Sequence, residues 1–549
     1  SMYGKHMSFE AIDKLTATPA DTVADVKKWL DTFAQCTAKT STGFRCLARV
    51  EDVERALATK MFKFLHEESG RLVHKVDAAY TVPSEMEGKI DFISGLNLLP
   101  MPHMAEVREL SSSTTFSPTT GGGGGGSSLH VVPGTIKSMY NLGSASADGI
   151  VQAAFEFQDL TAFSSSDLST FLSNTGAPNF DVEKHFGPFQ QFPPQAESTL
   201  DVQYLGTIGS GATNYYYTTS GWMYEMTQDL LSNSAYGIDV VSMSYGWSEA
   251  EQCEISPGSA PCSSGGSAAF VKAVNTNFQK LGAAGVTLLA ASGDAGAHGR
   301  SDLSCSSGTV HPGFPAASPY ITAVGATQLG SDAKAGGSAP ICQNQLQCAI
   351  SGSEIVSSTK TGSLITSGGG FSLYADRPSY QDAAVSAYLS KSGATPPNGD
   401  FNSAGRGYPD VAALGHSYYI ELDGEVQSVD GTSAACPVFA GVLSQINAAR
   451  VKNGGSKIGF ANPLLYAAWA HDASSFNDVT SGNNKCTQSG SACCSTGFEA
   501  TSGWDATTGL GTPNYAKLVS SINEVTGAST PQDALAELID ALRKMFPQA

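Results

Sequence analysis

The chain has 549 residues, of which 41% are hydrophobic and only 15% are charged. This composition excludes a disordered protein, and the length predicts at least two folding units. The formal net charge of −19 argues against nucleic acid, which selects basic surfaces, and no apolar run of about 18 residues predicts a membrane helix. We therefore expect neither nucleic acid nor membrane as a partner. The acidic balance suits work in acid, although a role in solubility explains it equally well.

Residues 1–110 predict a small α+β unit. Helical periodicity runs from Ser8 to Phe33, and a second amphipathic helix is predicted from Ala48 to Glu67. The apolar stretch that follows from Arg71 reads as a strand ended by Pro83.

Residues 111–128 contain serine, threonine and six consecutive glycines. Such a segment buries too little apolar surface to order itself, so we expect a flexible linker with a cleavage site. Its position between two globular segments is typical of a pro-segment joined to a catalytic domain. A plain tether between domains is the alternative.

Residues 129–527 alternate short apolar runs with a helical pattern. Runs at 149–157, 238–246 and 286–291 predict buried strands, and 267–285 predicts a helix between two of them. This order predicts a parallel α/β sheet whose loops build a site at the carboxyl ends of the strands, and Asp294 lies in one such loop. The tail, 528–549, predicts an amphipathic helix that docks on the domain. A partner-binding role and an artificial extension are alternatives.

The eleven cysteines mostly fall in close pairs, which indicates an oxidising compartment. Three pairs are close in sequence, four further cysteines could form two bridges, and Cys436 is left over as a small buried thiol. The pairs are Cys36 with Cys46, Cys253 with Cys262, and Cys342 with Cys348, and the four are Cys305, Cys486, Cys493 and Cys494. A reduced protein with buried thiols is the alternative.

The stretch "VDGTSAACPVFAG", residues 429–441, resembles the nucleophile turn of subtilisin-like proteases, with Ser433 as the nucleophile. Those enzymes carry their base in a His-Gly-Thr setting, which none of the ten histidines here has. His298 precedes a glycine, but an arginine follows. Glu197 and Asp201 are four residues apart and share one face if the segment is helical, where two carboxyls can share a proton. On a surface such a pair is usually a solvated one.

Glu197 and Asp201, then "SGDAG" with Asp294, then "GTSAACP" with Ser433, resemble the sedolisin family of serine-carboxyl peptidases. Further matches are "SGGGFS" at 367–372, "GRGYPDVAAL" at 405–414 and "YGKHMSFEAIDKL" near the start. The resemblance is closest to the tripeptidyl peptidases and extends to about residue 520. It implies a subtilisin-like parallel sheet flanked by helices, preceded by an α+β pro-domain that acts as an intramolecular inhibitor.

The resemblance also implies a role for each matched residue. Ser433 is the nucleophile, Glu197 the general base, Asp201 its supporting acid and Asp294 the oxyanion group. A histidine is almost fully protonated near pH 4, whereas a glutamate with an ordinary pKa of about 4.3 remains partly ionised there. A protonated Asp294 donates a hydrogen bond to the developing oxyanion, whereas an ionised one repels it.

The family binds one calcium ion, and the matching segments are "FNDVTSGNN" and "ATSGWDATTG". They imply the carboxylates of Asp478 and Asp505 as ligands, with the carbonyl oxygens of Val479, Thr501 and Gly503. Oxygen ligands suit calcium, and the alternative is that both aspartates cap turns.

We therefore expect an acid-active, self-activating peptidase that takes peptides or unfolded proteins and releases tripeptides from free N-termini. An acid endopeptidase is the nearest alternative, and a catalytically dead binding protein or a neutral subtilisin-type protease is more distant. We expect a monomer. Because no Asn-x-Ser/Thr glycosylation signal occurs, we expect secretion, with a lysosomal or vacuolar location as the alternative.

Overall fold

The computed structural model describes residues 4–66, 71–76, 80–91, 93–96, 106–109, 129–157, 162–219, 221–252, 265–397, 399–488 and 492–527. The predicted linker at 111–128, the tail at 528–549 and the pair Cys253 and Cys262 lie outside these residues. No helix in the described ranges is long and apolar enough to cross a membrane.

The larger unit, residues 129–527, is built on a sheet of eight strands in the order β16-β13-β11-β9-β6-β8-β7, with β19 beside β13. Neighbouring strands are parallel except for β16, which is antiparallel to β13. The central strands are continuous apolar runs because both faces of a parallel sheet are covered. The strands are β6 (Val151–Phe157), β7 (Val182–Phe186), β8 (Thr213–Thr219), β9 (Val240–Met243), β11 (Thr287–Ala291), β13 (Thr322–Leu329), β16 (Glu354–Val356) and β19 (Val411–Leu414).

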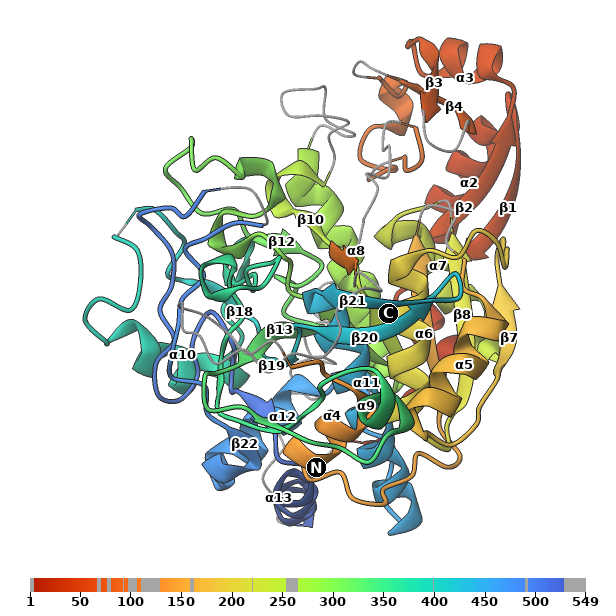
Figure 1. Ribbon diagram of the computed structural model, residues 1–549. Coiled ribbons are helices and arrows are strands. Elements are labelled where there is room, and N and C mark those ends of the chain that lie inside the picture. The colour runs from red at the N-terminus through yellow and green to blue at the C-terminus, as the bar shows by residue number, and fades with distance from the viewer. Residues whose placement is uncertain are drawn as a thin grey trace.

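Helices cover both faces of this sheet (Figure 1). Successive residues of β6 point to opposite faces: Ala154 joins the core packed by α6 and α11, whereas Phe155 joins the core packed by α7 and α8. This layering confirms the predicted α/β class. The helices are α4 (Pro133–Met139), α5 (Ser165–Thr175), α6 (Ala196–Ile208), α7 (Met223–Ser232), α8 (Gly266–Ala283), α9 (Pro340–Asn344), α10 (Asp382–Leu389), α11 (Thr432–Lys452), α12 (Asn462–His471) and α13 (Tyr515–Gly527).

Short strands outside the main sheet pair with one another in small sheets around it. The hairpin of β20 and β21 leads directly into α11. The short strands are β10 (Trp247–Ser248), β12 (Gly313–Phe314), β14 (Lys334–Ala335), β15 (Ala349–Ser351), β17 (Gly370–Asp376), β18 (Gly405–Tyr408), β20 (Tyr418–Leu422), β21 (Glu425–Asp430), β22 (Phe476–Asn477) and β23 (Thr512–Pro513).

The N-terminal unit lies at one side of the molecule, where β1 packs against α7 (Figure 1). It is a mixture of helices and two-stranded antiparallel sheets, as predicted. A further strand from this unit, β5, pairs with β21 of the larger unit. The elements are α1 (Phe9–Leu15), α2 (Ala20–Leu30), α3 (Val50–Ala56), β1 (Ala34–Thr40), β2 (Gly43–Ala48), β3 (Met61–His66), β4 (Arg71–Val76) and β5 (Glu106–Glu109).

Two predicted helices of the N-terminal unit were too long. The segment 8–33 contains two helices, α1 and α2, because Pro19 lacks an N–H and disfavours helical backbone in the residue before it. The segment 48–67 is helical only as α3, since Ala58 has a positive φ of 50° and the chain then pairs as β3 with β4. Periodicity alone did not show this break. The strand predicted up to Pro83 ends earlier, at Val76.

The predicted disulfides are confirmed wherever both cysteines are described. Bridges join Cys36 to Cys46, Cys342 to Cys348, Cys305 to Cys494 and Cys486 to Cys493. Cys436 is free and buried, as expected.

Candidate active site

Ser433 is the second residue of α11 and only 1% exposed. The strand β21 ends at Asp430, and an extended Gly431 carries the chain into the helix. Pro437 lies four residues after Ser433 and has no N–H, so the carbonyl oxygen of Ser433 lacks its ordinary helical donor. The hydroxyl of Ser244, just beyond β9, lies 3.4 Å from that oxygen instead. The turn therefore holds Ser433 at the start of a buried helix.

Glu197 and Asp201 lie on α6, and both are buried at 3% and 0% exposure. Because α6 is buried from Glu197 to Ile208 and packs on α11, the pair is not a solvated surface pair. The hydroxyl of Ser433 lowers the pKa of the Glu197 carboxyl, so the two groups are neighbours. A carboxylate in this position can accept the proton of the serine hydroxyl.

Ser244 lies close to both carboxyls of α6. Its hydroxyl donates to Asp201 Oδ1 at 2.8 Å. The same hydroxyl lowers the pKa of Glu197, which indicates that it lies beside that carboxyl as well.

Burial raises the pKa of Glu197, and the negative charge of Asp294 adds to this rise. The hydroxyls of Ser433 and Ser244 and the charge of Arg300 lower the pKa of Glu197. Burial also raises the pKa of Asp201, and this carboxyl further feels the charges of Glu156 and Glu197. The cluster therefore holds protons more tightly than isolated carboxyls do.

Asp294 follows β11 in the loop predicted from the sequence, and it is 2% exposed. Its Oδ1 accepts hydrogen bonds from the backbone N–H of Thr432 at 2.8 Å and from the Thr432 hydroxyl at 2.7 Å. Arg300 Nη2 lies 3.6 Å from Oδ2. Since Thr432 precedes Ser433, Asp294 is fixed beside the nucleophile turn, and Oδ2 is the oxygen left to carry a proton.

A fourth buried carboxyl of the site, Glu156 on β6, was not identified from the sequence. It is fully buried, and Tyr245 donates a hydrogen bond to its Oε2 at 2.6 Å. Burial raises its pKa, and the charge of Glu197 contributes. The signal was present in the sequence, because a single acidic residue interrupts an apolar run predicted to be a buried strand.

A pocket opens beside Asp294, lined by the backbone of residues 291–296 and by Trp247, Arg300 and Tyr408 among others. Ser292 also lines it, and its buried hydroxyl has no hydrogen-bond partner within the described ranges. A concave space that shares a wall with the reacting groups is where a substrate side chain is expected to lie.

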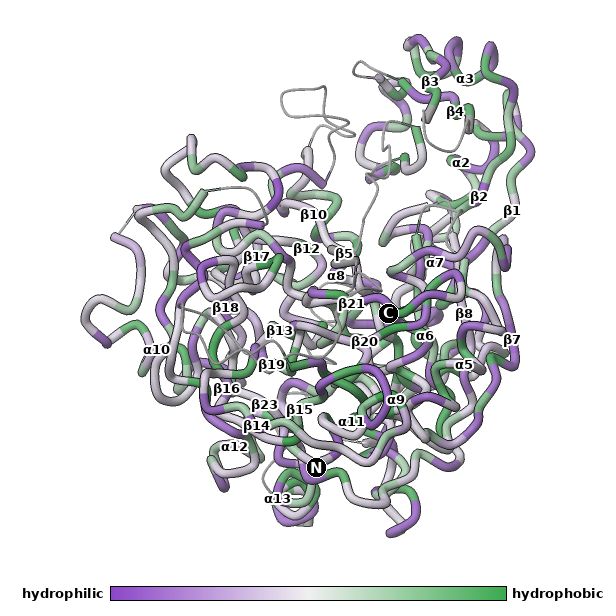
Figure 2. Tube along the Cα trace, in the orientation of Figure 1, coloured by the Kyte–Doolittle hydropathy of each residue, from purple (hydrophilic) through white to green (hydrophobic). Residues whose placement is uncertain are grey.

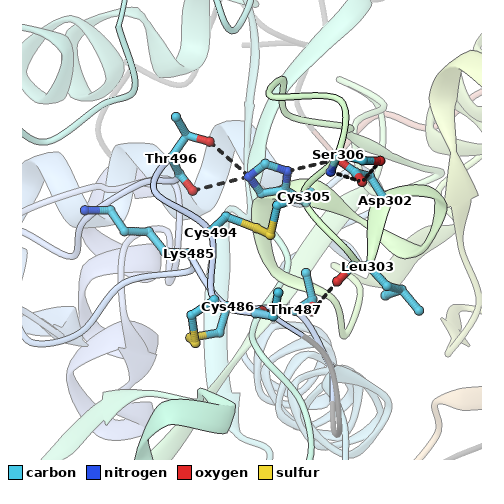
Figure 3. The surroundings of a disulfide bond; sticks show 12 residues. Asp302, Leu303, Cys305, Ser306, Lys485, Cys486, Thr487, Cys494 and Thr496 are labelled. Atoms are coloured by element: carbon cyan, nitrogen blue, oxygen red, sulfur yellow. Dashed lines mark hydrogen bonds and ion pairs between the residues drawn. A yellow bond between two sulfur atoms is a disulfide. The ribbon is translucent and has the colours of Figure 1, made fainter.

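His298, whose following glycine made it the nearest match to a subtilisin histidine, is buried beside Asp302 and Thr496, which Figure 3 labels. Its Nδ1 lies 3.4 Å from Asp302, and its Nε2 lies 3.0 Å from the hydroxyl of Thr496. The disulfide Cys305–Cys494 joins the same two loops. This histidine therefore ties the loop after Asp294 to the loop of Thr496.

The residues implied for calcium meet around one loop. Asp478 Oδ2 accepts a hydrogen bond from the N–H of Gly503 at 2.8 Å, and Asp505 Oδ2 accepts one from Thr501 at 2.9 Å. Val479, next to Asp478, is buried. Burial raises the pKa of Asp505 to about 6 and also raises that of Asp478. The buried carboxyl of Asp505, the exposed carboxyl of Asp478 and nearby backbone carbonyls fit a hard cation, which would favour the ionised carboxylates.

Two other observations bear on this loop. Lys391 Nζ lies 3.0 Å from the hydroxyl of Thr501 and also contacts the carbonyl oxygen of Ser502, so one cationic group is already present. Within the described ranges, no group of three or more His, Cys, Asp or Glu side chains could hold a metal ion. A calcium site here would depend on two carboxylates and backbone carbonyls.

Comparisons with known proteins agree with this geometry. Residues 1–99 match the pro-kumamolisin activation domain, and residues 207–464 match the subtilase family. Physarolisin of Physarum polycephalum is 38% identical over 94% of this chain and 88% of its own length. Tripeptidyl-peptidase 1 of Mus musculus is 31% identical over 95% of this chain and 86% of its own length.

A solved structure of a Pseudomonas sedolisin, a serine-carboxyl proteinase in complex with pseudo-iodotyrostatin, supports the fold. It is 23% identical, with a TM-score of 0.54, and the match covers 73% of this chain and 99% of that one. Fold and sequence together define a serine peptidase that carries an activation domain. The chain belongs to the sedolisin family of serine-carboxyl peptidases.

Proposed function

We propose that this chain is the zymogen of an acid-active peptidase that releases tripeptides from free N-termini. The observation that carries the proposal is the buried Ser433 hydroxyl beside the buried carboxyl of Glu197, with Asp201 on the same helix and Asp294 beside the nucleophile turn. The substrates are peptides or unfolded proteins, and we expect the enzyme to act as a monomer.

The chemistry is acyl transfer. Glu197 takes the proton as Ser433 Oγ attacks the carbonyl carbon of the scissile bond, and Asp201, through Ser244, holds Glu197 in place. Asp294, protonated on Oδ2, donates a hydrogen bond to the carbonyl oxygen as that oxygen becomes negative. The C–N bond then breaks as Glu197 returns the proton to the leaving amine, and water hydrolyses the acyl-serine by the same steps.

Acid produces the required protonation state through the contact between Asp294 and Glu197. The charge of an ionised Asp294 raises the pKa of Glu197, so protonating Asp294 lowers it again and favours an ionised Glu197. Arg300 Nη2 lies 3.6 Å from Asp294 Oδ2 and forms an ion pair with the ionised carboxylate. We propose that a neutral Asp294 beside an ionised Glu197 is the working state.

We propose residues 1–110 as the inhibitory pro-domain, 111–128 as the linker that is cut, and 129–527 as the catalytic domain. Two contacts between the first and third are sensitive to acid. Lys39 of β1 lies 3.8 Å from Asp229 of α7, and Asp13 is the acidic group whose charge acts on the buried Lys280 of α8. Protonation of either aspartate removes a favourable interaction. Acid would therefore loosen the pro-domain, and the disulfides suit a secreted or lysosomal route.

Peptides with free and blocked N-termini test the mode of cleavage. With one peptide in unblocked and N-acetylated forms at pH 4, we expect tripeptide release from the unblocked form only. The measurement is mass spectrometry of the products over time, with a Ser433→Ala preparation as the blank. Equal cleavage of both forms would make the enzyme an endopeptidase, and cleavage of neither would remove the proposed function.

We also propose that calcium binds the Asp478–Asp505 loop, where it would neutralise the buried carboxylate of Asp505 and the exposed one of Asp478 and fix the chain between α12 and α13. Calcium at one hundred times its dissociation constant adds about 2.7 kcal/mol to stability, so the melting temperature should rise by several degrees. Because the ion binds ionised carboxylates, the rise should shrink as pH falls below about 6, the pKa of Asp505.

Calorimetry with and without calcium, after treatment with a chelator, measures this effect. Asp478→Asn should abolish the response to calcium, whereas the exposed Asp472→Asn should retain it, since Asp472 only caps a turn with Ser474. An unchanged melting temperature for the parent chain, or an equal response with magnesium, would contradict a calcium site.

A further inference from the structure

The strand β5 of the N-terminal unit covers the edge of the hairpin that leads to the nucleophile. It forms the third strand of a sheet with the order β20-β21-β5, and Figure 2 labels it beside β21. The pairing is antiparallel, with Glu106 opposite Asp430 and Glu109 opposite Gln427. Asp430 is three residues before Ser433. The chain therefore keeps one of its own extended segments beside the active site.

The direction of β5 decides which part of a substrate it resembles. β21 runs toward Ser433, so an antiparallel strand on its edge runs away from Ser433 as it goes from N- to C-terminus. Because Glu106 pairs with Asp430, the N-terminal end of β5 is the end nearest to the nucleophile turn. In a substrate attacked by Ser433, the residues beyond the broken bond, on the leaving-amine side, would take this course.

The hairpin that offers this edge is fastened to the helix of the catalytic carboxyls. Gln203 of α6 donates to the carbonyl oxygen of Glu421 at 2.8 Å and accepts from its N–H at 3.2 Å. Tyr204, the next residue of α6, donates to the carbonyl oxygen of Tyr419 at 2.7 Å. These contacts fix β20, and through it β21, relative to Glu197 and Asp201.

Both ends of the hairpin are held by buried carboxylates. At its tip, Asp167 of α5 accepts hydrogen bonds from the N–H groups of Asp423 and Gly424 at 2.8 and 3.1 Å. At the end of β21, Asp430 accepts from the N–H groups of Ser417 and Leu364, both at 2.7 Å. A strand anchored in this way keeps its position when its neighbour leaves, and its edge then offers unpaired backbone groups.

We propose that the free edge of β21 binds the leaving side of the peptide substrate as an added antiparallel strand. β5 occupies this site in the zymogen and must leave before a substrate can bind. The inference rests on the proposed peptidase function. Recognition by main-chain hydrogen bonds at every second residue accepts many sequences, which suits an enzyme that degrades peptides generally. It rejects a substrate residue without an N–H where the ladder needs a donor.

An N-methyl scan of the substrate tests the proposal. The full chain after acid treatment is given one unblocked peptide and three copies, each methylated on a single backbone nitrogen at the second, third or fourth residue of the leaving side. Alternate N–H groups face β21, so kcat/KM should fall about tenfold at alternate positions and little between them. If the unmethylated peptide and the three N-methylated peptides are all cleaved equally well, this inference alone is overturned. If the unmethylated peptide is not cleaved, the proposed function is overturned as well.

A matched pair of variants tests the zymogen. The N–H groups of neighbouring residues in a strand point to opposite sides, so only one of Val107 and Arg108 can donate to β21. Proline at the residue that donates to β21 should shorten the delay before activity appears on acidification at least severalfold. Proline at the residue that does not donate should leave this delay near that of the parent chain. Equal delays in Val107→Pro, Arg108→Pro and the parent chain would contradict the role given to β5.

Discussion

Replacing Ser433 with alanine is expected to lower peptide hydrolysis by a factor on the order of 10⁶, the loss that follows removal of the serine nucleophile in a subtilisin. Alanine has no hydroxyl that could form the acyl intermediate, and it fits a buried helix without strain. The same variant should fail to cut itself on acidification, which measures whether maturation is autocatalytic. Hydrolysis is followed with an unblocked peptide at pH 4, and maturation by the size of the chain.

Ser444→Ala is the matched control for this experiment. Ser444 lies on the same helix, is equally buried, and its hydroxyl has no hydrogen-bond partner within the described ranges, so its removal should leave activity unchanged. If Ser433→Ala keeps even a hundredth of the parent activity, or matures by itself at the parent rate, Ser433 is not the nucleophile.

Two substitutions of Asp294 should distinguish the effect of its protonated form from that of its ionised form. Asp294→Ala removes the hydrogen-bond donor for the oxyanion, and we expect turnover to fall about 100- to 1,000-fold. Asp294→Asn keeps the oxygen that accepts from Thr432 and places an NH₂ donor where the protonated Oδ2 stood. An amide donates at any pH, so this variant should remain active further into the neutral range than the parent chain.

The Asp294→Asn substitution should also shift the acid side of the plot of kcat against pH. Asparagine carries no charge, so it no longer raises the pKa of Glu197, and Glu197 should ionise at lower pH. The measurement is kcat between pH 2 and pH 8 for the parent and both variants, with the exposed Asp382→Asn as a control for net charge. An Asp294→Asn profile that coincides with the parent profile, or a fully active Asp294→Ala, would remove Asp294 from the oxyanion site.

The sequence predicted the sheet and the catalytic cluster because both depend on local patterns. Continuous apolar runs locate strands buried on two faces, and the loops that follow them locate Asp294. The spacing of Glu197 and Asp201 predicted a shared face of a helix, and only the burial of α6 distinguished this pair from a solvated one. The motif around Ser433 then selected the family.

The parts that could not be predicted depend on contacts distant in sequence. Glu156 belongs to the cluster because β6 pairs beside β9, which leads to Ser244 and Tyr245. Lys391 reaches the Asp478–Asp505 loop from a segment 110 residues before Thr501. The pairing of β5 with β21 joins segments separated by the linker and most of the catalytic domain. Local periodicity in the sequence does not predict contacts between residues so far apart.

The pH dependence of kcat/KM on one unblocked peptide, measured from pH 2 to pH 8, tests most directly whether carboxyls replace histidine as the base. A neutral Asp294 beside an ionised Glu197 exists only in a limited pH range, so we predict a bell-shaped profile with its maximum in acid. Both sides of the profile report the titration of the carboxyl cluster around Glu197 and Asp201, whose pKa values are raised by burial and by neighbouring negative charges. A maximum at pH 7 or above would contradict this account.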